Sequence, residues 1–179
     1  MSGNMIWMDL EMTGLDPEIN VIIEIATVVT TASLDIVAEG PSLAIMQPKG
    51  SMDLMDNWNQ SHHSASGLLG RIESDGVSEA EAEAMTLDFV SSHVDPGEAP
   101  LCGNSIWQDR RFLARYMPSL ESYLHYRIID VSTVKELAER WAPAVVDEVV
   151  KKGNHRALDD VLESIEELRH YRTHLFKLS

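Results

Sequence analysis

The order in which strand-like and helix-like segments follow one another constrains the fold of this chain more than any other feature. Residues 5–12 alternate apolar with acidic residues, and residues 20–31 are rich in Val, Ile and Thr, so both segments predict strands. Residues 35–39 and 43–47 predict two shorter strands with a Gly-Pro pair between them. The opening part of the chain therefore predicts an antiparallel meander.

Helix-like segments dominate the later sequence. A capping box at residues 78–81 predicts a helix that runs to about residue 93, and a buried strand is expected at 100–103. A helix at 106–117 and a strand at 127–131 follow. The last two expected elements are a helix that is capped by Ser132 and ends before Pro143, and a long final helix. An apolar stripe at helical spacing indicates the last of these, formed by Leu158, Val161, Leu162, Ile165, Leu168 and Tyr171. Strands first, then helices alternating with short strands, predict an α/β fold with a mixed sheet and helices packed on it.

The composition is ordinary for a compact globular chain, with 44% hydrophobic and 24% charged residues among 179. No linker is long enough to divide it, so we expect residues 1–179 to form a single domain. The most apolar run, residues 21–29, is short and interrupted by Glu24, which argues against a membrane span. The first eleven residues lack the basic start of a signal peptide, and Cys102 is the only cysteine. A reducing compartment, most simply the cytoplasm, is therefore expected.

The formal net charge of −15 limits the kind of nucleic acid that the chain can bind. A protein that clamps a long nucleic acid needs a basic stripe to displace counterions, and this charge argues against one. A short oligonucleotide has few phosphates, and bound cations can supply positive charge locally. The acidity therefore bounds the length of a nucleic-acid substrate, unless it serves only to keep the protein in solution.

Two acids in the first strand are the first candidate functional residues. Asp9 and Glu11 lie two residues apart, so their side chains share a face of that strand, and like charges placed together cost stability. An edge strand with one solvated face explains these two residues equally well.

Two later segments add acids at the starts of helices. Asn104 is followed five residues later by Asp109, in the first turn of a helix after a buried strand. His155 precedes the last helix, and Asp160 stands in its first turn. Acids also favour helix N-termini through the helix dipole alone, and for either residue taken singly that explanation is sufficient.

Taken together, these segments resemble a known family. The order Asp-x-Glu, Asn-x-x-x-x-Asp and His-x-x-x-x-Asp resembles the three motifs of the DEDD exonuclease superfamily, in its histidine variant. Longer matches resemble the oligoribonucleases in particular, at residues 9–15 (DLEMTGL), 103–105, 108–112, 126–127, 130–133 and 155–160. Trp107 departs from the pattern, because a small residue, usually glycine, is expected there.

The resemblance implies a fold and a reaction. It implies a ribonuclease H-like, five-stranded mixed sheet flanked by α-helices, and 3′→5′ hydrolysis of very short RNA, dinucleotides in particular, to mononucleotides. Four carboxylates cannot be packed together without cations, so two Mg²⁺ or Mn²⁺ ions are expected. Such a metal pair stabilises the attacking and leaving oxygens of a phosphodiester. By resemblance, Asp9 bridges the metals, Glu11 and Asp160 serve the metal that activates water, and Asp109 serves the leaving-group metal.

His155 is the candidate general base, since the unperturbed histidine pKa of about 6.5 suits proton transfer near neutral pH. Considered alone, His155 is better explained as a packing or capping residue at a helix start, and only its position before Asp160 favours the catalytic role.

Further residues resemble the family's substrate contacts. Leu15 is expected to wedge between two bases, although an ordinary core leucine is the alternative. Trp58 and His63 lie in a polar stretch, where Trp58 either stacks on a base or anchors a loop. The expected phosphate contacts are Ser105, Arg127 and Ser132.

The resemblance also implies a homodimer, in which Tyr126 and Arg127 reach the active site of the other subunit. An arginine suits a phosphate contact because its donors fork onto phosphate oxygens. From the local sequence alone, however, a surface ion pair is the favoured explanation of Arg127.

Two other functions remain open from the sequence. A proofreading-type DNA exonuclease uses the same acids and histidine, together with a polymerase partner. A non-catalytic interaction module on the same fold would be free to lose ligands, yet all five positions are filled here.

Overall fold

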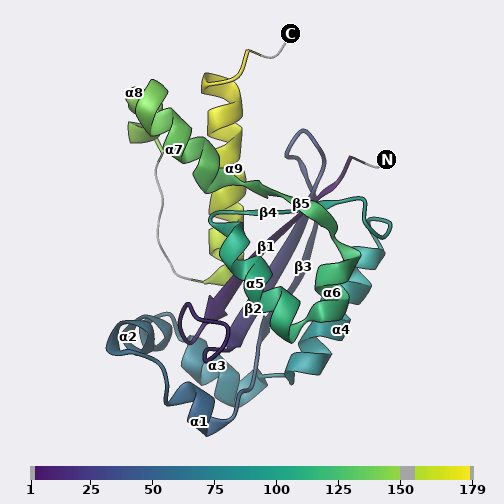
Figure 1. Cartoon of the computed structure of the whole chain (residues 1–179), viewed down its shortest axis with the longest axis vertical. Coiled ribbons are helices and arrows are strands. Elements are labelled where there is room, and N and C mark those ends of the chain that lie inside the picture. The colour runs from purple at the N-terminus through teal and green to yellow at the C-terminus, as the bar shows by residue number, and fades with distance from the viewer. Residues whose placement is uncertain (1–2, 150–155, 178–179) are drawn as a thin grey trace.

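The computed structural model describes residues 3–149 and 156–177 of the chain. Within these ranges lies a five-stranded sheet with the order β3-β2-β1-β4-β5 (Figure 1). Its strands are β1 (Met5–Met12), β2 (Ile22–Thr30), β3 (Ile36–Ala44), β4 (Pro100–Gly103) and β5 (His125–Asp130). The pairs β1–β2 and β2–β3 are antiparallel, whereas β1–β4 and β4–β5 are parallel. The predicted meander and mixed sheet are therefore confirmed.

The two short strands expected at 35–39 and 43–47 are wrong, because one continuous strand, β3, runs through the Gly-Pro pair. The register with β2 shifts between Glu39 and Ser42, so Gly40 and Pro41 form an irregularity on this edge strand. An edge strand tolerates proline, since the missing N–H faces away from the ladder. A Cβ at Gly40 would lie 2.4 Å from the ring of Phe89, so glycine lets that ring pack against the strand.

Helices cover both faces of the sheet. They are α1 (Lys49–Met52), α2 (Asn57–Ala65), α3 (Leu68–Asp75), α4 (Glu79–Ser91), α5 (Ile106–Tyr116), α6 (Pro118–Tyr123), α7 (Val131–Trp141), α8 (Pro143–Asp147) and α9 (Ala157–His174). Figure 1 shows α4, α5 and α6 in front of the sheet and α9 behind it. One hydrophobic core joins the front helices to Ile6, Met8 and Leu10, and a second joins α7 and α9 to Met5 and Trp7. The sides of β1 are thus divided by alternation, and the acids Asp9 and Glu11 follow Trp7 on the α9 side.

Helix termini agree with the sequence in part. The capping box of Ser78 and Glu81 opens α4, as predicted. Asp130 caps α7 by accepting the N–H of Ser132, so the prediction that Ser132 is the cap is wrong. Residues 56–66, a polar stretch without an apolar stripe, contain α2, whose first turn is capped by Asp56.

One end of the sheet collects the segments that position the candidate site. The carboxyl end of β1 points toward α1, α2 and α3, and α9 begins at that same end (Figure 1). Helix α9 then packs along β1 and β2 toward the end where both termini lie. Residues distant in sequence therefore meet at the carboxyl end of β1.

A buried acid fixes the start of α9. Glu24 of β2 is fully buried, and its carboxylate accepts a hydrogen bond from Arg71 of α3 and lies 3.5 Å from Nε of Arg156. It also accepts the N–H of Ala157, the first residue of α9, at 3.2 Å. An ion pair between residues far apart in sequence therefore anchors the first turn of the helix that carries Asp160, which gives Glu24 a structural role.

We predict that Glu24→Gln lowers the free energy of unfolding by about 2–3 kcal/mol, measured by urea denaturation. Removing one partner of a buried pair is costly, but Arg71 and Arg156 keep 29% and 33% of their side chains exposed, which reduces the loss. The matched control is Glu73→Gln on the exposed face of α3, expected to change the free energy by less than about 0.5 kcal/mol. Equal losses in the two variants would show that the network carries no special stability.

Candidate active site

Three carboxylates from the two ends of the chain meet at one point. Asp9 and Glu11 come from β1, and Asp160 comes from the first turn of α9. Each offers one carboxylate oxygen, and these oxygens all lie within 4.8 Å of one another. Asp9 and Glu11 share one face of β1, and the start of α9 packs against that face. The fold therefore brings together residues that are 151 positions apart (160 − 9).

Asp109 joins this group from α5. Its side chain is buried, and one carboxylate oxygen accepts the backbone N–H of Leu10 at 3.0 Å, between the two acids of β1. Its charge raises the pKa of Asp9, second only to burial as a cause. All four acids expected from the sequence thus surround the carboxyl end of β1.

The pKa values of three of these carboxyl groups are raised. Burial, followed by the charges of Asp109, Glu11 and Asp160, raises the pKa of Asp9 well above its usual value. Burial and the charge of Asp160 raise the pKa of Glu11 to about 8, despite an opposing effect of Arg156. Burial raises the pKa of Asp109 to about 7, against the hydrogen bond from Leu10. Without a positive charge among them, these carboxyls hold protons near neutral pH.

The residues fit hard divalent cations. Carboxylate oxygens are the ligands that Mg²⁺ and Mn²⁺ prefer, and the cluster supplies several within reach of one ion. Burial raises all three pKa values, and the neighbouring carboxylates raise those of Asp9 and Glu11 further, so a bound cation would stabilise the ionised carboxylates by supplying positive charge. The acidic residues of this site can therefore bind divalent metal.

The expected general base, His155, lies outside the described residues, so the structure does not place it. Another histidine lies beside the acids. His63 of α2 is buried, with Nδ1 3.9 Å from a carboxylate oxygen of Glu11 and Nε2 3.1 Å from the carbonyl oxygen of Met12. The substrate contact expected at His63 stays a prediction, and the structure adds that its ring lies beside a candidate metal ligand.

Trp58 and Leu15 present apolar surface to solvent. Trp58 is 60% exposed on α2, and its ring stacks on that of His62 with centroids 3.8 Å apart. Leu15 is 71% exposed in the turn after β1, so it is not an ordinary core leucine. The side chain of Gln108 donates to the carbonyl oxygen of Leu15 at 2.5 Å, which ties this turn to α5. Gln108 was named only as part of a motif, because its role depends on a contact between residues far apart in sequence.

Ser105 and Ser132 lie together at the carboxyl ends of β4 and β5. Their hydroxyl oxygens are 3.2 Å apart, and the N–H of Ser105 donates to both Asp130 and Ser132 at 2.9 Å. The Ser132 hydroxyl also donates to Asn104 at 3.0 Å. Asp130 accepts the N–H groups of both serines and thereby holds them side by side.

Tyr126 and Arg127 lie elsewhere on the sheet. In the register of β4 with β5, Pro100 pairs with His125 but Leu101 pairs with Ile128, so Tyr126 and Arg127 bulge from the edge strand. Both are exposed, and the guanidinium carbon of Arg127 lies 5.2 Å from the centroid of the Tyr126 ring. A bulge re-aims side chains, and these two stand at the amino end of β5, opposite the end that carries Ser105 and Ser132.

Trp107, the departure from the family pattern, leaves Asp109 in place. Its ring is 54% exposed, with the guanidinium carbon of Arg111 5.8 Å from the ring centroid. Residues two apart on a helix do not face each other, so the indole and the buried carboxylate point in different directions.

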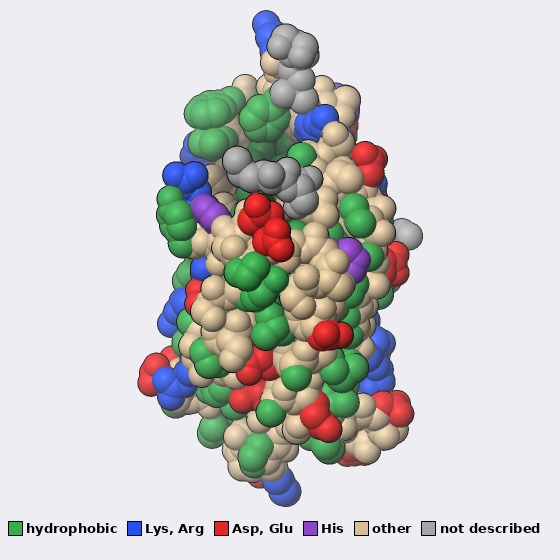
Figure 2. Space-filling view, turned by 90° about the vertical axis from the view of Figure 1, so that its right-hand side faces the viewer, with side chains coloured by type: hydrophobic (Ala, Val, Ile, Leu, Met, Phe, Trp, Pro, Cys, Tyr) green, Lys and Arg blue, Asp and Glu red, His purple; other side chains and the backbone are tan. Residues whose placement is uncertain are grey.

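Positive charge does not form a stripe on the face that bears α4 and α6. On this face, shown in Figure 2, acidic side chains are spread over the surface and Lys and Arg lie toward its margins. This distribution agrees with the net charge of −15.

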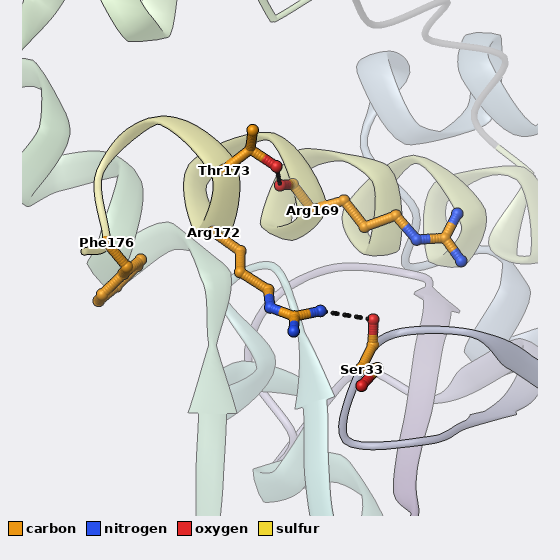
Figure 3. A pocket seen from close by; sticks show the side chains of 5 residues that line it. All are labelled: Ser33, Arg169, Arg172, Thr173 and Phe176. Atoms are coloured by element: carbon orange, nitrogen blue, oxygen red, sulfur yellow. Dashed lines mark hydrogen bonds between the residues drawn. The ribbon is translucent and has the colours of Figure 1, made fainter. Parts of the chain in front are cut away.

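A separate pocket of about 480 Å³ is lined by two arginines whose side chains donate hydrogen bonds to the protein backbone. It lies between the end of α9 and the β2–β3 turn, and Figure 3 shows Arg172 reaching from α9 to the backbone of Ser33. That hydrogen bond measures 2.8 Å, and Arg169 likewise donates to the carbonyl oxygen of Leu34. Because the guanidinium groups serve backbone carbonyls, they hold the turn in place.

Comparisons with known proteins identify the family. The chain matches the exonuclease family (RNase_T) over residues 6–168. It is 58% identical to the oligoribonuclease of Hahella chejuensis over 176 residues, covering 98% of this chain and 97% of that protein. It is 59% identical to the oligoribonuclease of Marinobacter nauticus over 174 residues (97% of each chain), and 55% identical to that of Escherichia coli K12 over 176 residues (98% and 97%).

Solved structures support the fold. Escherichia coli exonuclease I in complex with a dT13 oligonucleotide is similar with a TM-score of 0.75 and 15% identity, over 96% of this chain and 41% of that chain. An apo exonuclease I gives a TM-score of 0.73 and 14% identity, over 98% of this chain and 43% of that chain. This chain thus spans about two fifths of those exonuclease I chains, and the likeness shows a shared ribonuclease H-like fold. With the family match and the high identity along nearly the whole chain, this chain belongs to the exonuclease family and, within it, to the oligoribonucleases.

Proposed function

We propose that this chain is a 3′→5′ exoribonuclease that degrades very short RNA, dinucleotides in particular, to mononucleotides. The membership in the oligoribonucleases supports the activity and the substrate class. The observation that carries the proposal is the meeting of Asp9, Glu11 and Asp160 within 4.8 Å, with Asp109 beside them.

In this proposal the four acids hold two divalent cations, Mg²⁺ or Mn²⁺. When bound, such a pair stabilises both the attacking and the leaving oxygen of a phosphodiester. Asp9 lies near enough to Asp109, Glu11 and Asp160 for each of their charges to raise its pKa, which would suit a ligand shared by the two ions. The hydrogen bond from Leu10 fixes the orientation of the Asp109 carboxylate. The ligands are therefore held by a strand and two helix starts rather than by loops.

The reaction is the hydrolysis of the last phosphodiester bond at the 3′ end of the RNA. The water oxygen bonds to phosphorus, the bond from phosphorus to the 3′ oxygen of the preceding nucleotide breaks, and that oxygen gains a proton. His155, five residues before Asp160, takes the proton of the attacking water as general base. His63, whose Nδ1 lies 3.9 Å from a carboxylate oxygen of Glu11, contacts the substrate next to that ligand.

Substrate contacts follow from exposure and position. The exposed Leu15 and Trp58 offer apolar surfaces on which bases can pack or stack. Ser105 and Ser132 gather hydroxyl groups at the carboxyl ends of β4 and β5, where they contact phosphate. Few basic groups are available to neutralise a long backbone, which supports a short substrate.

We also propose that the protein is a homodimer, with Tyr126 and Arg127 acting in the partner's site. The two residues bulge from an edge strand and are exposed at the end of β5 opposite Ser132. Leu137, Trp141 and Phe176 further expose apolar surface beside a groove of about 340 Å³. Exposed apolar side chains around a groove are a common mark of a protein interface.

Residues 1–179 would form a single exonuclease domain that works in the cytoplasm, a proposal supported by the single sheet and by a lone, buried cysteine. Among the described helices, none has the length and apolar character needed to cross a membrane.

The function is tested with labelled RNA of two, four and eight nucleotides, in the presence of Mg²⁺ or Mn²⁺. We expect the dinucleotide to be hydrolysed fastest and the matching DNA dinucleotide more slowly. His155→Ala should reduce turnover by about 10²–10⁴-fold with an unchanged melting temperature, because a general base contributes about that much. Asp88→Asn, on the exposed face of α4, is the matched surface control and should keep full activity. Equal initial rates on all three lengths would remove the length preference, and no RNA hydrolysis with either metal would overturn the function.

Metal binding should stabilise the fold more strongly at high pH. The folded-state pKa values of Glu11, about 8, and Asp109, about 7, lie above their ordinary values, so the metal-free protein binds extra protons and loses stability as pH rises through this range. Cations replace those protons. Adding Mn²⁺ after EDTA treatment should therefore raise the melting temperature by about 5 °C more near pH 8.5 than near pH 5.5. An increase independent of pH would argue against cation binding at these acids.

The proposal that Arg127 acts in the partner's active site is tested by mixing two inactive variants, Arg127→Ala and Asp9→Asn. If Arg127 acts in the partner's site, unfolding and refolding an equal mixture restores about a quarter of the sites, because half of the dimers combine one intact acid cluster with one partner arginine. If Arg127 serves its own subunit, the mixture stays inactive.

A further inference from the structure

A second group of metal-ligand side chains lies far from the acids. Glu148, in the turn that ends α8, and His170 and His174 of α9 each offer one ligand atom, and these atoms all lie within 4.8 Å of one another. The candidate active site and the relatives' names assign nothing to these residues.

The two histidines have the spacing that metal sites on helices use. His170 and His174 are four residues apart, so they lie on one face of α9, and their ring centroids are 4.5 Å apart. The turn after α8 places the carboxylate of Glu148 against that face.

The tautomer of His170 is fixed by its neighbour. Nε2 lies 2.7 Å from the carbonyl oxygen of Val145, and because a carbonyl oxygen only accepts, Nε2 carries the proton. The lone pair of the neutral ring is then on Nδ1. Histidines that bind metals are usually oriented in this way, with the other ring nitrogen donating to a carbonyl or a carboxylate.

We propose that Glu148, His170 and His174 form a binding site for Zn²⁺ or a similar borderline transition-metal ion. Two imidazoles and one carboxylate are a ligand set of known zinc sites, with a fourth position open to water. Ligand atoms of a tetrahedral zinc ion lie about 3.3 Å apart, so the three atoms need only small side-chain rotations to close on one ion. Imidazole ligands disfavour Mg²⁺, which prefers oxygen, so the ions of the two sites differ in kind.

The site is separate from the acids. Asp160 stands in the first turn of α9 and His174 is its last residue, a rise of about 21 Å along the helix axis. These turns lie at opposite ends of α9 (Figure 1). A zinc ion here would link the end of α8 to the end of α9, and it would leave the residues proposed for hydrolysis untouched.

The proposal is tested by calorimetric titration of the full chain with Zn²⁺ alone, in saturating Mg²⁺ that occupies the acids. We expect one Zn²⁺ per chain, and an affinity at least about tenfold weaker in each of His170→Ala, His174→Ala and Glu148→Gln. His174 and Glu148 are exposed, so their variants keep the fold even if loss of the Val145 contact disturbs His170→Ala. A rise of the melting temperature with Zn²⁺ should disappear in the same variants.

Two control variants make the outcome decisive. His93→Ala removes a partly buried histidine at the end of α4, outside this group, and should keep full Zn²⁺ affinity. Asp9→Asn should keep it as well, because it changes only the acids of β1. The site is refuted by any of three results: no Zn²⁺ binding, unchanged affinity in His174→Ala, or a loss in Asp9→Asn or His93→Ala equal to that in His174→Ala.

Discussion

Mutual repulsion of buried carboxylates is the constraint on which the rest of this structure depends. Asp9, Glu11 and Asp160 meet within 4.8 Å with Asp109 beside them. The raised pKa values of Asp9, Glu11 and Asp109 show that the fold opposes the ionisation of these three carboxyls. A protein tolerates such a cluster where other interactions hold it in place. Here the cost is met by two cores that fix β1 on both of its faces and by the packing of α9 against β1 and β2.

Two sets of polar contacts fix the positions of the acids in this cluster. The N–H of Leu10 holds Asp109 between the acids of β1, so the strand backbone itself orients the fourth carboxylate. Glu24, with Arg71 and Arg156, anchors the first turn of α9 and places Arg156 where its charge opposes the raised pKa of Glu11. One acid that serves structure thus stands next to acids that serve the proposed chemistry, and only their partners distinguish them.

Much of the fold could be predicted from the sequence, because β1 alternates apolar and acidic residues, β2 is rich in Val, Ile and Thr, and α9 carries an apolar stripe. The prediction failed where tertiary contacts overrode local signals. Gly40 and Pro41 predicted a break, but the edge position of β3 and the packing of Phe89 carry the strand through them. Helix α2 was missed because its single buried residue, His63, gives no apolar stripe. The cap of α7 was assigned to Ser132 rather than Asp130, since both residue types cap helices and only geometry separates them.

The sequence alone named the four acids that we propose as metal ligands, since the spacing of acids on β1 and at two helix starts, together with the family motifs, singled them out. Tertiary structure alone decided what surrounds them: His63 against Glu11, Gln108 on the turn of Leu15, and the bulge that turns Tyr126 and Arg127 outward. The physical reason is the distance along the sequence over which each interaction acts. Periodicity and capping are local properties that sequence spacing records, whereas a hydrogen bond between residues 93 positions apart exists only once the chain has folded.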